Sequence, residues 1–169
     1  MTHFKRGTAH ASGEVDVSAD DFWAMLRDWG AVMKWAAKGP DAPAPLIDTI
    51  YKDGDSVDVL PCTRICLFAP ESGFPPFPET LIHADPVARR IYYNVEGVVS
   101  GGMQNYLATT WIDELGPNRC RVTLQSTFDI PADAEVGPVR DFLEAVYNKS
   151  VIQGMASAVK QEKAVLVGA

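Results

Sequence analysis

The feature that most constrains the fold of this chain is an apolar stripe along residues 138–163. At about 100° per residue, a helix over this segment gathers its apolar and small side chains on one side and projects Asp141 and Lys160 from the other. Pro138 suits a first helical turn, and about 26 residues of helix would extend for about 39 Å. The stripe predicts one helix long enough to span a small domain. Its inward residues are Val136, Leu143, Tyr147, Val151, Gly154 and Ala158.

Small residues recur within this stripe. Ser150, Gly154 and Ala158 are spaced every four residues on the inward side, so the middle of the helix carries little side-chain volume. Either the helix packs very closely against a neighbouring layer, or space is left beneath it.

The first part of the chain predicts a strand and two short helices. Residues 7–17 end in an alternating pattern typical of a strand with one wet face. Ser18, followed by two aspartates, predicts the N-terminus of a helix that ends near Gly30. Residues 31–37 predict a second short helix.

From residue 46 to residue 131 the pattern alternates, with turn residues at intervals of about ten positions. The clearest alternation is in 121–129, where Ser126 and Phe128 point to the dry face. The Asp53-Gly54 pair predicts a tight hairpin. The expected strands are 46–51, 56–60, 62–68, 79–83, 90–96, 104–114 and 121–129.

These elements predict an α+β fold. Only the final helix is long enough to cover the dry face of a curved antiparallel sheet of six or seven strands. A sheet wrapped around one helix with small residues in its middle favours a pocket between the two layers, and ligands bind preferentially in such concave apolar places.

The composition limits the partners. At 169 residues we expect one ligand-binding domain over 1–169, and a formal charge of −7 argues against binding to nucleic acid or to an anionic membrane surface. The N-terminal residues have no apolar signal-peptide core, and three cysteines without C-x-x-C spacing are typical of a reduced compartment. The expected location is therefore cytoplasmic.

Known cofactor and metal motifs are absent from the sequence. Cys62, Cys66 and Cys120 do not have the spacing of a zinc site, and no histidine pair completes them. No glycine-rich phosphate loop follows a strand. We expect neither a metal nor a cofactor.

Several motifs, taken in order, resemble the START-like or Bet v 1-like (SRPBCC) superfamily of ligand-binding proteins and polyketide cyclases. These are the Asp-Asp-Phe-Trp run at 20–23 with Trp29-Gly30 and Trp35, the Cys-Thr-Arg run at 62–64, Glu-Thr-Leu at 79–81, and Asn105-Tyr106. They are similar to motifs of the plant abscisic acid receptors, and more so to those of bacterial-type cyclase-like relatives. The resemblance implies the helix-grip fold, in which the curved sheet encloses the long C-terminal helix.

The resemblance also implies which residues face the cavity. Strand alternation agrees for Ser126 and Phe128. The chain departs from the receptors at Val151, where they carry asparagine, and their gate-loop motif is absent from 69–76. Hormone sensing and phosphatase inhibition are therefore not implied. The implied ligand-binding residues are Arg64, Cys66, Phe68, Glu79, Leu81, Tyr93, Tyr106, Ser126, Phe128 and Val151.

The polar candidates each have two interpretations. Glu79 could act in the pocket as acid, base or anchor, or lie exposed at a strand end. His83 has the same strand parity as Glu79 and could relay a proton, or serve as a structural hydrogen-bonding group. Arg64 could anchor a ligand carboxylate or phenolate, or form an internal ion pair with Glu79. Catalytic roles are expected for Glu79 and His83 if the chain is an enzyme.

Aromatic side chains provide further candidates. Tyr93, Tyr106 and Tyr147 offer rings to an apolar ligand and hydroxyls to its oxygens, or are ordinary core residues. The proline-rich loop over 69–78 is either a lid at the cavity mouth or a cover for the sheet edge.

Three functional hypotheses follow. The first is a monomer or homodimer that encloses a small hydrophobic molecule, aromatic or polycyclic and oxygenated. The second is an enzyme without cofactor that uses the same cavity for cyclisation, dehydration or isomerisation, as a lyase or isomerase. The third is a protein-interaction module, against which the polar outer face of 121–129 argues.

Overall fold

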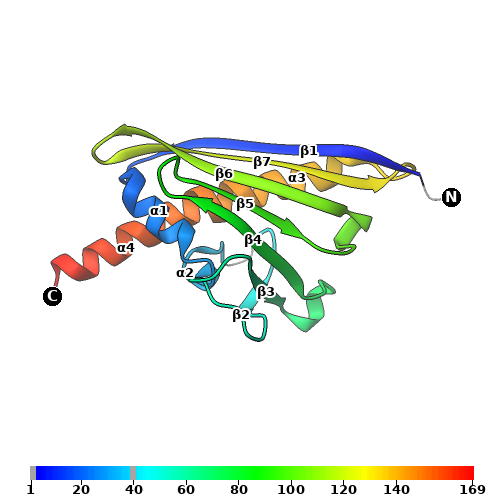
Figure 1. Cartoon of the computed structure of the whole chain (residues 1–169), viewed down its shortest axis with the longest axis horizontal. Helices are drawn as coiled ribbons and strands as arrows, with labels where there is room; N and C mark the ends of the chain where they lie inside the picture. The colour runs from blue at the N-terminus through cyan, green and yellow to red at the C-terminus, as the bar shows by residue number, and fades with distance from the viewer. Residues whose placement is uncertain (1–2, 39–40) are drawn as a thin grey trace.

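One antiparallel sheet and one long helix make up most of the molecule (Figure 1). The computed structural model describes residues 3–38 and 41–169. The seven strands lie in the order β1-β7-β6-β5-β4-β3-β2, so the first strand of the chain closes against the last. The strands are β1 (Phe4–Val15), β2 (Leu46–Tyr51), β3 (Cys62–Phe68), β4 (Phe77–Asp85), β5 (Arg90–Val95), β6 (Gln104–Gly116) and β7 (Arg119–Pro131).

The C-terminal helix is continuous and has a wider π-helical segment at its centre. It consists of α3 (Val136–Val146), η3 (Tyr147–Gly154) and α4 (Met155–Val167), and the backbone is right-handed helical at both junctions. Its inward side is buried, and its charged side chains project to solvent, as the stripe predicts. The helix predicted over 138–163 is therefore confirmed. π-helical turns are rare and frequently occur at functional sites.

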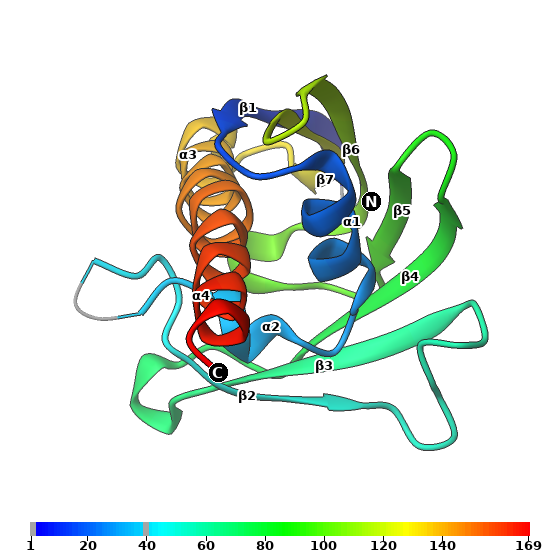
Figure 2. The same ribbon diagram turned by 90° about the vertical axis from the view of Figure 1, so that its left-hand side faces the viewer.

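The sheet curves around this helix (Figure 2). The helices α1 (Ala19–Arg27) and α2 (Val32–Trp35) follow β1 and pack against α4. Ser18 caps α1, because its hydroxyl accepts a hydrogen bond from the Asp21 backbone amide at 3.1 Å. The α+β helix-grip prediction is confirmed, with seven strands. The core lies between the concave face and the helices, where alternate residues of β7 are buried.

The predicted strand over 56–60 and its tight hairpin are wrong. The Asp53-Gly54 pair does make a turn, closed by a hydrogen bond from the Asp55 amide to the Lys52 carbonyl. However, the chain beyond it forms only an isolated bridge between Ser56 and Val59. Instead, β2 pairs directly with β3 across a longer loop, because a turn motif sets only local direction and not the pairing partner.

Two short 3-10 helices lie in the connections near one end of the sheet: η1 (Pro70–Ser72) and η2 (Ser100–Gly102). None of the helices over the described ranges has the length and hydropathy needed to cross a membrane.

Candidate functional site

A cavity of about 340 Å³ lies between the concave face of the sheet and the N-terminal half of the long helix. This volume is at the lower end for small-molecule sites. The sheet, α2, α3, η3 and the η1 and η2 connections all contribute to its wall. The lining residues are Val32, Trp35, Ala36, Ala44, Leu46, Arg64, Cys66, Phe68, Phe74, Pro75, Phe77, Glu79, Tyr93, Val99, Gly101, Met103, Tyr106, Pro138, Val139, Phe142, Leu143, Val146, Tyr147, Ser150 and Val151.

The charged part of this wall is an ion pair between neighbouring strands. Arg64 on β3 lies opposite Glu79 on β4, and its Nε and Nη2 donate to the Glu79 Oε2 at 2.8 and 2.6 Å. Nη1 of Arg64 donates to the Trp29 carbonyl oxygen at 2.9 Å. The guanidinium also lies over the Trp29 ring, with Cζ 3.6 Å from the ring centroid. Arg64 is thus held on three sides.

Burial and charge act in opposite directions on Arg64. Burial alone would lower the pKa of its guanidinium, but the adjacent Glu79 carboxylate raises it, and the net shift is upward. Arg64 therefore stays charged inside the protein, and its compensating charge is Glu79.

A chain of hydroxyl groups beside the cavity links the long helix to two strands of the sheet. The Tyr106 and Tyr147 hydroxyl oxygens are 2.6 Å apart, and the Tyr147 hydroxyl donates to Ser126 Oγ at 2.7 Å. Burial raises the pKa of Tyr93 to about 12 and also raises the pKa values of Tyr106 and Tyr147. All three phenols are consequently neutral at ordinary pH.

Cys66 lies beside the ion pair. Its Sγ is 3.8 Å from Glu79 Oε2, and burial raises the pKa of the thiol to about 12. Because the thiolate is the nucleophilic form, Cys66 is a neutral wall residue and not a reactive one.

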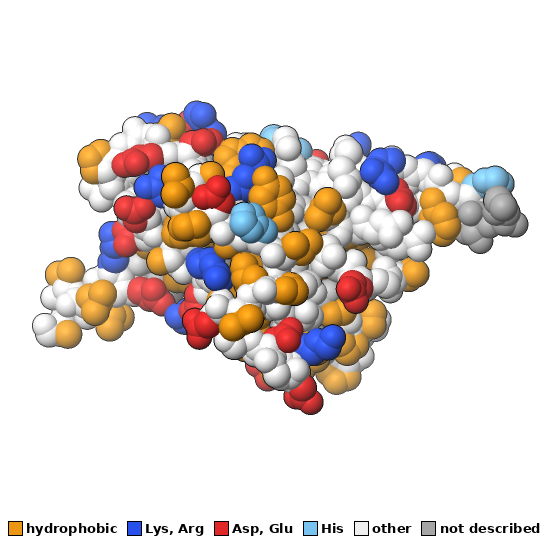
Figure 3. All heavy atoms as spheres, in the orientation of Figure 1, with side chains coloured by type: hydrophobic (Ala, Val, Ile, Leu, Met, Phe, Trp, Pro, Cys, Tyr) orange, Lys and Arg blue, Asp and Glu red, His pale blue; other side chains and the backbone are white. Residues whose placement is uncertain are grey.

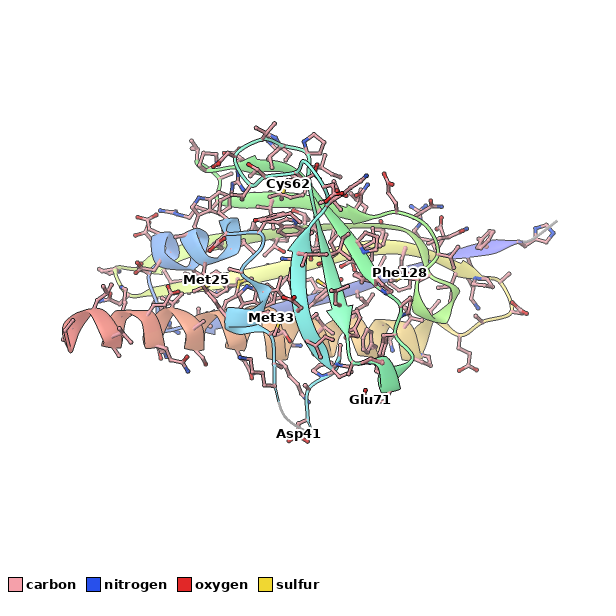
Figure 4. The ribbon with its side chains drawn as sticks, turned by 90° about the horizontal axis from the view of Figure 1, so that it is seen from below. Met25, Met33, Asp41, Cys62, Glu71 and Phe128 are labelled. Atoms are coloured by element: carbon pink, nitrogen blue, oxygen red, sulfur yellow. The ribbon has the colours of Figure 1, made fainter. Side chains whose placement is uncertain are left out.

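Aromatic side chains meet at the cavity mouth. Phe68 and Phe74 have ring centroids 5.4 Å apart, and Phe74 stacks on Phe142 of α3 at 6.1 Å. Figure 4 labels Glu71, in the η1 turn of the loop over 69–78. Through Phe74 this loop reaches from the sheet to α3, and its Phe74 and Pro75 form part of the cavity wall.

Most of the predicted ligand-binding residues lie in the cavity wall: Arg64, Cys66, Phe68, Glu79, Tyr93, Tyr106, Tyr147 and Val151. Leu81, Ser126 and Phe128 face the interior but lie outside the wall, which corrects their placement. Phe128 packs over Gly7 of β1, and Tyr147 lies between Ser126 and Tyr106. Their strand parity is right, but all three side chains are buried in the core away from the cavity.

The placement of His83 in the pocket is wrong. Leu81 pairs with Tyr93 and His83 pairs with the next residue of β5, Tyr92, so Ile82 forms a bulge. A bulge adds one residue and reverses the parity beyond it. His83 is therefore exposed on the outer face of the sheet, where charged and hydrophobic side chains are interspersed (Figure 3).

Some wall residues were not predicted as site residues. Trp35, at the end of α2, reaches the cavity, as do Met103 before β6 and Phe142 of α3. The spacing of aromatic residues in the two opening helices indicates that Trp35 points inward. It does not indicate that Trp35 borders a cavity. Met103 follows two glycines and has no periodic pattern to identify it.

No group of three or more potential metal ligands converges within residues 3–38 and 41–169. Over the same ranges the cysteines are free and buried. The chemistry available in the wall is that of one ion pair, phenols, the Ser150 hydroxyl, a thiol, an indole and apolar surface.

Comparisons with known proteins agree with this architecture. A family model described as polyketide cyclase / dehydrase and lipid transport matches residues 6–162. No protein with a curated description matches the chain in sequence.

Solved structures with a similar fold come from several organisms. A Thermobifida fusca protein solved by NMR superposes with a TM-score of 0.72 at 17% identity, covering 91% of this chain and 93% of that one. A Bacillus cereus protein superposes with a TM-score of 0.71 at 16% identity, covering 93% of this chain and 98% of that one. A norcoclaurine synthase point mutant from Thalictrum flavum, in complex with a transition-state analogue, gives 0.66 at 17% identity, over 96% and 99%. At these identities the likeness shows a shared Bet v 1-like fold.

Proposed function

This chain belongs to the polyketide cyclase / dehydrase and lipid transport family, and from that premise we propose that it encloses a small hydrophobic molecule in the cavity between the sheet and the C-terminal helix. The ligand class is aromatic or polycyclic with a few oxygen atoms. Apolar walls provide the affinity, and a small number of buried polar groups orient the molecule.

The observation that carries this proposal is the composition of the wall. Aromatic and aliphatic side chains make up most of the lining, and the polar groups among them are concentrated in the Arg64–Glu79 pair and the tyrosine hydroxyls. Burying apolar ligand surface against such a wall is favourable by roughly 25 cal/mol per Å².

Native mass spectrometry of the freshly purified protein tests the proposal. A defined additional mass, recovered as a small molecule after denaturation and extraction, supports a bound ligand and identifies its chemical class. A clean mass of the polypeptide, together with no binding of hydrophobic dyes that fit such cavities, contradicts it.

A second candidate is catalysis in the same cavity without metal or redox chemistry. The observation that favours it is the arrangement of Glu79. Its Oε2 takes both hydrogen bonds from Arg64, and over the described residues Oε1 accepts none. A carboxylate held in this way can receive or deliver a proton in a cyclisation, dehydration or isomerisation.

Once a ligand is identified, its turnover can be compared in Glu79→Gln and Glu96→Gln variants. Glu96 is exposed just after β5, so its substitution is a matched control. Loss of turnover in Glu79→Gln alone, with circular dichroism showing that this variant is folded, supports the catalytic role. Unchanged turnover in that variant removes Glu79 as the acid or base.

A further inference from the structure

We infer that the cavity selects an uncharged ligand that carries a hydroxyl group, with Glu79 Oε1 as the acceptor of the ligand's hydroxyl proton. This inference deepens the proposed function and rests on it. It also assigns Arg64 a structural role instead of that of an anchor for ligand anions.

Most of the donor capacity of Arg64 is used within the protein. Three of its five N–H groups donate to protein oxygens, two bonds going to Glu79 and one to the Trp29 carbonyl. Its face is covered by the Trp29 ring, and the residue is 6% exposed. A ligand carboxylate that paired with the guanidinium as Glu79 does would have to displace Glu79, which would leave one of the two carboxylates buried without a partner.

The net charge of the wall leads to the same conclusion. Within the described lining, Arg64 and Glu79 are the charged residues, so the wall is neutral as a whole. The tyrosine hydroxyls and the Cys66 thiol are protonated there. An anionic ligand would bring an uncompensated charge into apolar surroundings, and such burial is strongly unfavourable.

Glu79 supplies an open acceptor in the cavity wall. Over the described residues, Oε1 of Glu79 accepts no hydrogen bond. Trp35 lines the same region of the cavity, since Arg64 Cζ lies 5.7 Å from its ring centroid, but its Nε1 is buried away from the cavity surface. The Trp35 ring therefore offers apolar surface beside Oε1, and Oε1 accepts the ligand's hydroxyl proton.

Within the hydroxyl chain, Tyr106 and Tyr147 use their protons inside the protein, whereas Tyr93 lies in the wall outside this chain and keeps a hydroxyl group that can donate or accept. Each tyrosine has a single hydroxyl proton. Tyr147 donates its proton to Ser126, so Tyr106 donates to Tyr147. The Tyr106 oxygen keeps its acceptor capacity toward the cavity, which also favours a ligand that donates.

Three probes with the same two rings test this selectivity: para-phenylphenol, para-phenylbenzoate and biphenyl. At neutral pH the first is an uncharged donor, the second is an anion, and the third has no polar group. Titration calorimetry with the intact chain should give para-phenylphenol an affinity at least about tenfold above that of para-phenylbenzoate, since a hydrogen bond to a charged group is involved. Equal or tighter binding of the benzoate overturns the inference.

Two variants separate the roles of the polar groups. Glu79→Gln leaves the Arg64 charge without its partner, so the preference should shift toward the benzoate, whereas the control Glu96→Gln should keep the original preference. Trp35→Phe removes an N–H that lies behind the cavity surface, so it should leave the ratio of phenol affinity to benzoate affinity unchanged. If Glu79→Gln does not alter this ratio, the assignment of Oε1 as the acceptor is wrong.

The outcome for biphenyl distinguishes the inference from the proposed function. If biphenyl binds and the phenol has no advantage, only the inference fails. If none of the three probes binds and native mass spectrometry finds no extra mass, the cavity does not hold ligands of this class and both fail.

Discussion

Gly154 lies so close to Trp35 that a Cβ built on the glycine would be 2.0 Å from the Trp35 carbonyl oxygen. One turn earlier, Ser150 Oγ accepts a hydrogen bond from the Ala37 amide at 3.1 Å. The long helix is therefore in backbone contact with the end of α2 at the boundary between η3 and α4. This contact closes one end of the cavity, which lies on the N-terminal side of it along the helix.

Gly154→Ala should accordingly destabilise the protein. The new methyl group overlaps the Trp35 carbonyl, and overpacking of this kind costs about 1–3 kcal/mol. Gly137→Ala in the same helix is the control, because a Cβ there meets nothing closer than Arg140 at 3.9 Å. Urea unfolding of both variants gives the two free energies. A Gly154→Ala protein as stable as Gly137→Ala would contradict the close contact.

Removal of either member of the buried ion pair should cost about 3–5 kcal/mol of unfolding free energy, because the other charge loses its partner. The side chains of Arg64 and Glu79 are 8% and 13% exposed, so water compensates little. The double variant Arg64→Met/Glu79→Leu should lose less than the sum of the single variants. Denaturant titration of the unsubstituted protein, the two single variants and the double variant gives the coupling free energy between Arg64 and Glu79. Strictly additive losses of unfolding free energy would show that the two groups are independent.

Stability should fall as the pH rises from about 10 toward 12. Burial raises the pKa of Tyr93 from 10.0 to about 12, so in this range the unfolded chain releases a proton that the folded chain retains. The stabilisation that comes from the protonated, buried Tyr93 is complete below the pKa that tyrosine has in the unfolded chain. Above that pKa it declines by up to about 1.4 kcal/mol per pH unit for each such group. Unfolding titrations across this range should show a shallower decline for Tyr93→Phe. Equal slopes for the two proteins would contradict the shift.

Phe74→Ala should speed the release of a captured ligand. The Phe74 ring bridges Phe68 and Phe142 at the mouth, and an aromatic pair contributes about 0.5–1.5 kcal/mol. We expect dissociation to accelerate several-fold, with a smaller change in association. Phe4→Ala on β1 is a matched control, since Phe4 is also partly exposed. Stopped-flow displacement measures both rates, and identical dissociation in the two variants would show that this contact does not retain the ligand.

For some site residues the sequence predicted which face of the sheet the side chain points to. For others the answer depends on pairing with a neighbouring strand, which the sequence does not show. The alternation in β7 correctly predicted that Ser126 and Phe128 point inward, because a regular strand has a period of two. The same rule failed for His83, because the bulge at Ile82 arises from pairing with β5. Nothing within the segment 79–83 itself reveals that partner.

The small-residue stripe shows the same division. Both interpretations of it hold, at different positions: Gly154 permits close packing, and Ser150 borders the cavity. Likewise, the two interpretations of Arg64 were an ion pair with Glu79 and an anchor for a ligand anion. The structure shows the ion pair and leaves the Arg64 nitrogens engaged with protein oxygens.

The sequence by itself determined the long amphipathic helix, the antiparallel strands before it and the family to which the chain belongs, because periodicity and motif order are properties of contiguous residues. Only the tertiary structure decided where the cavity lies, which side chains border it and which polar atoms remain open within it. Those features depend on strand register and on contacts between segments distant in the chain, such as Trp29 with Arg64 and Trp35 with Gly154.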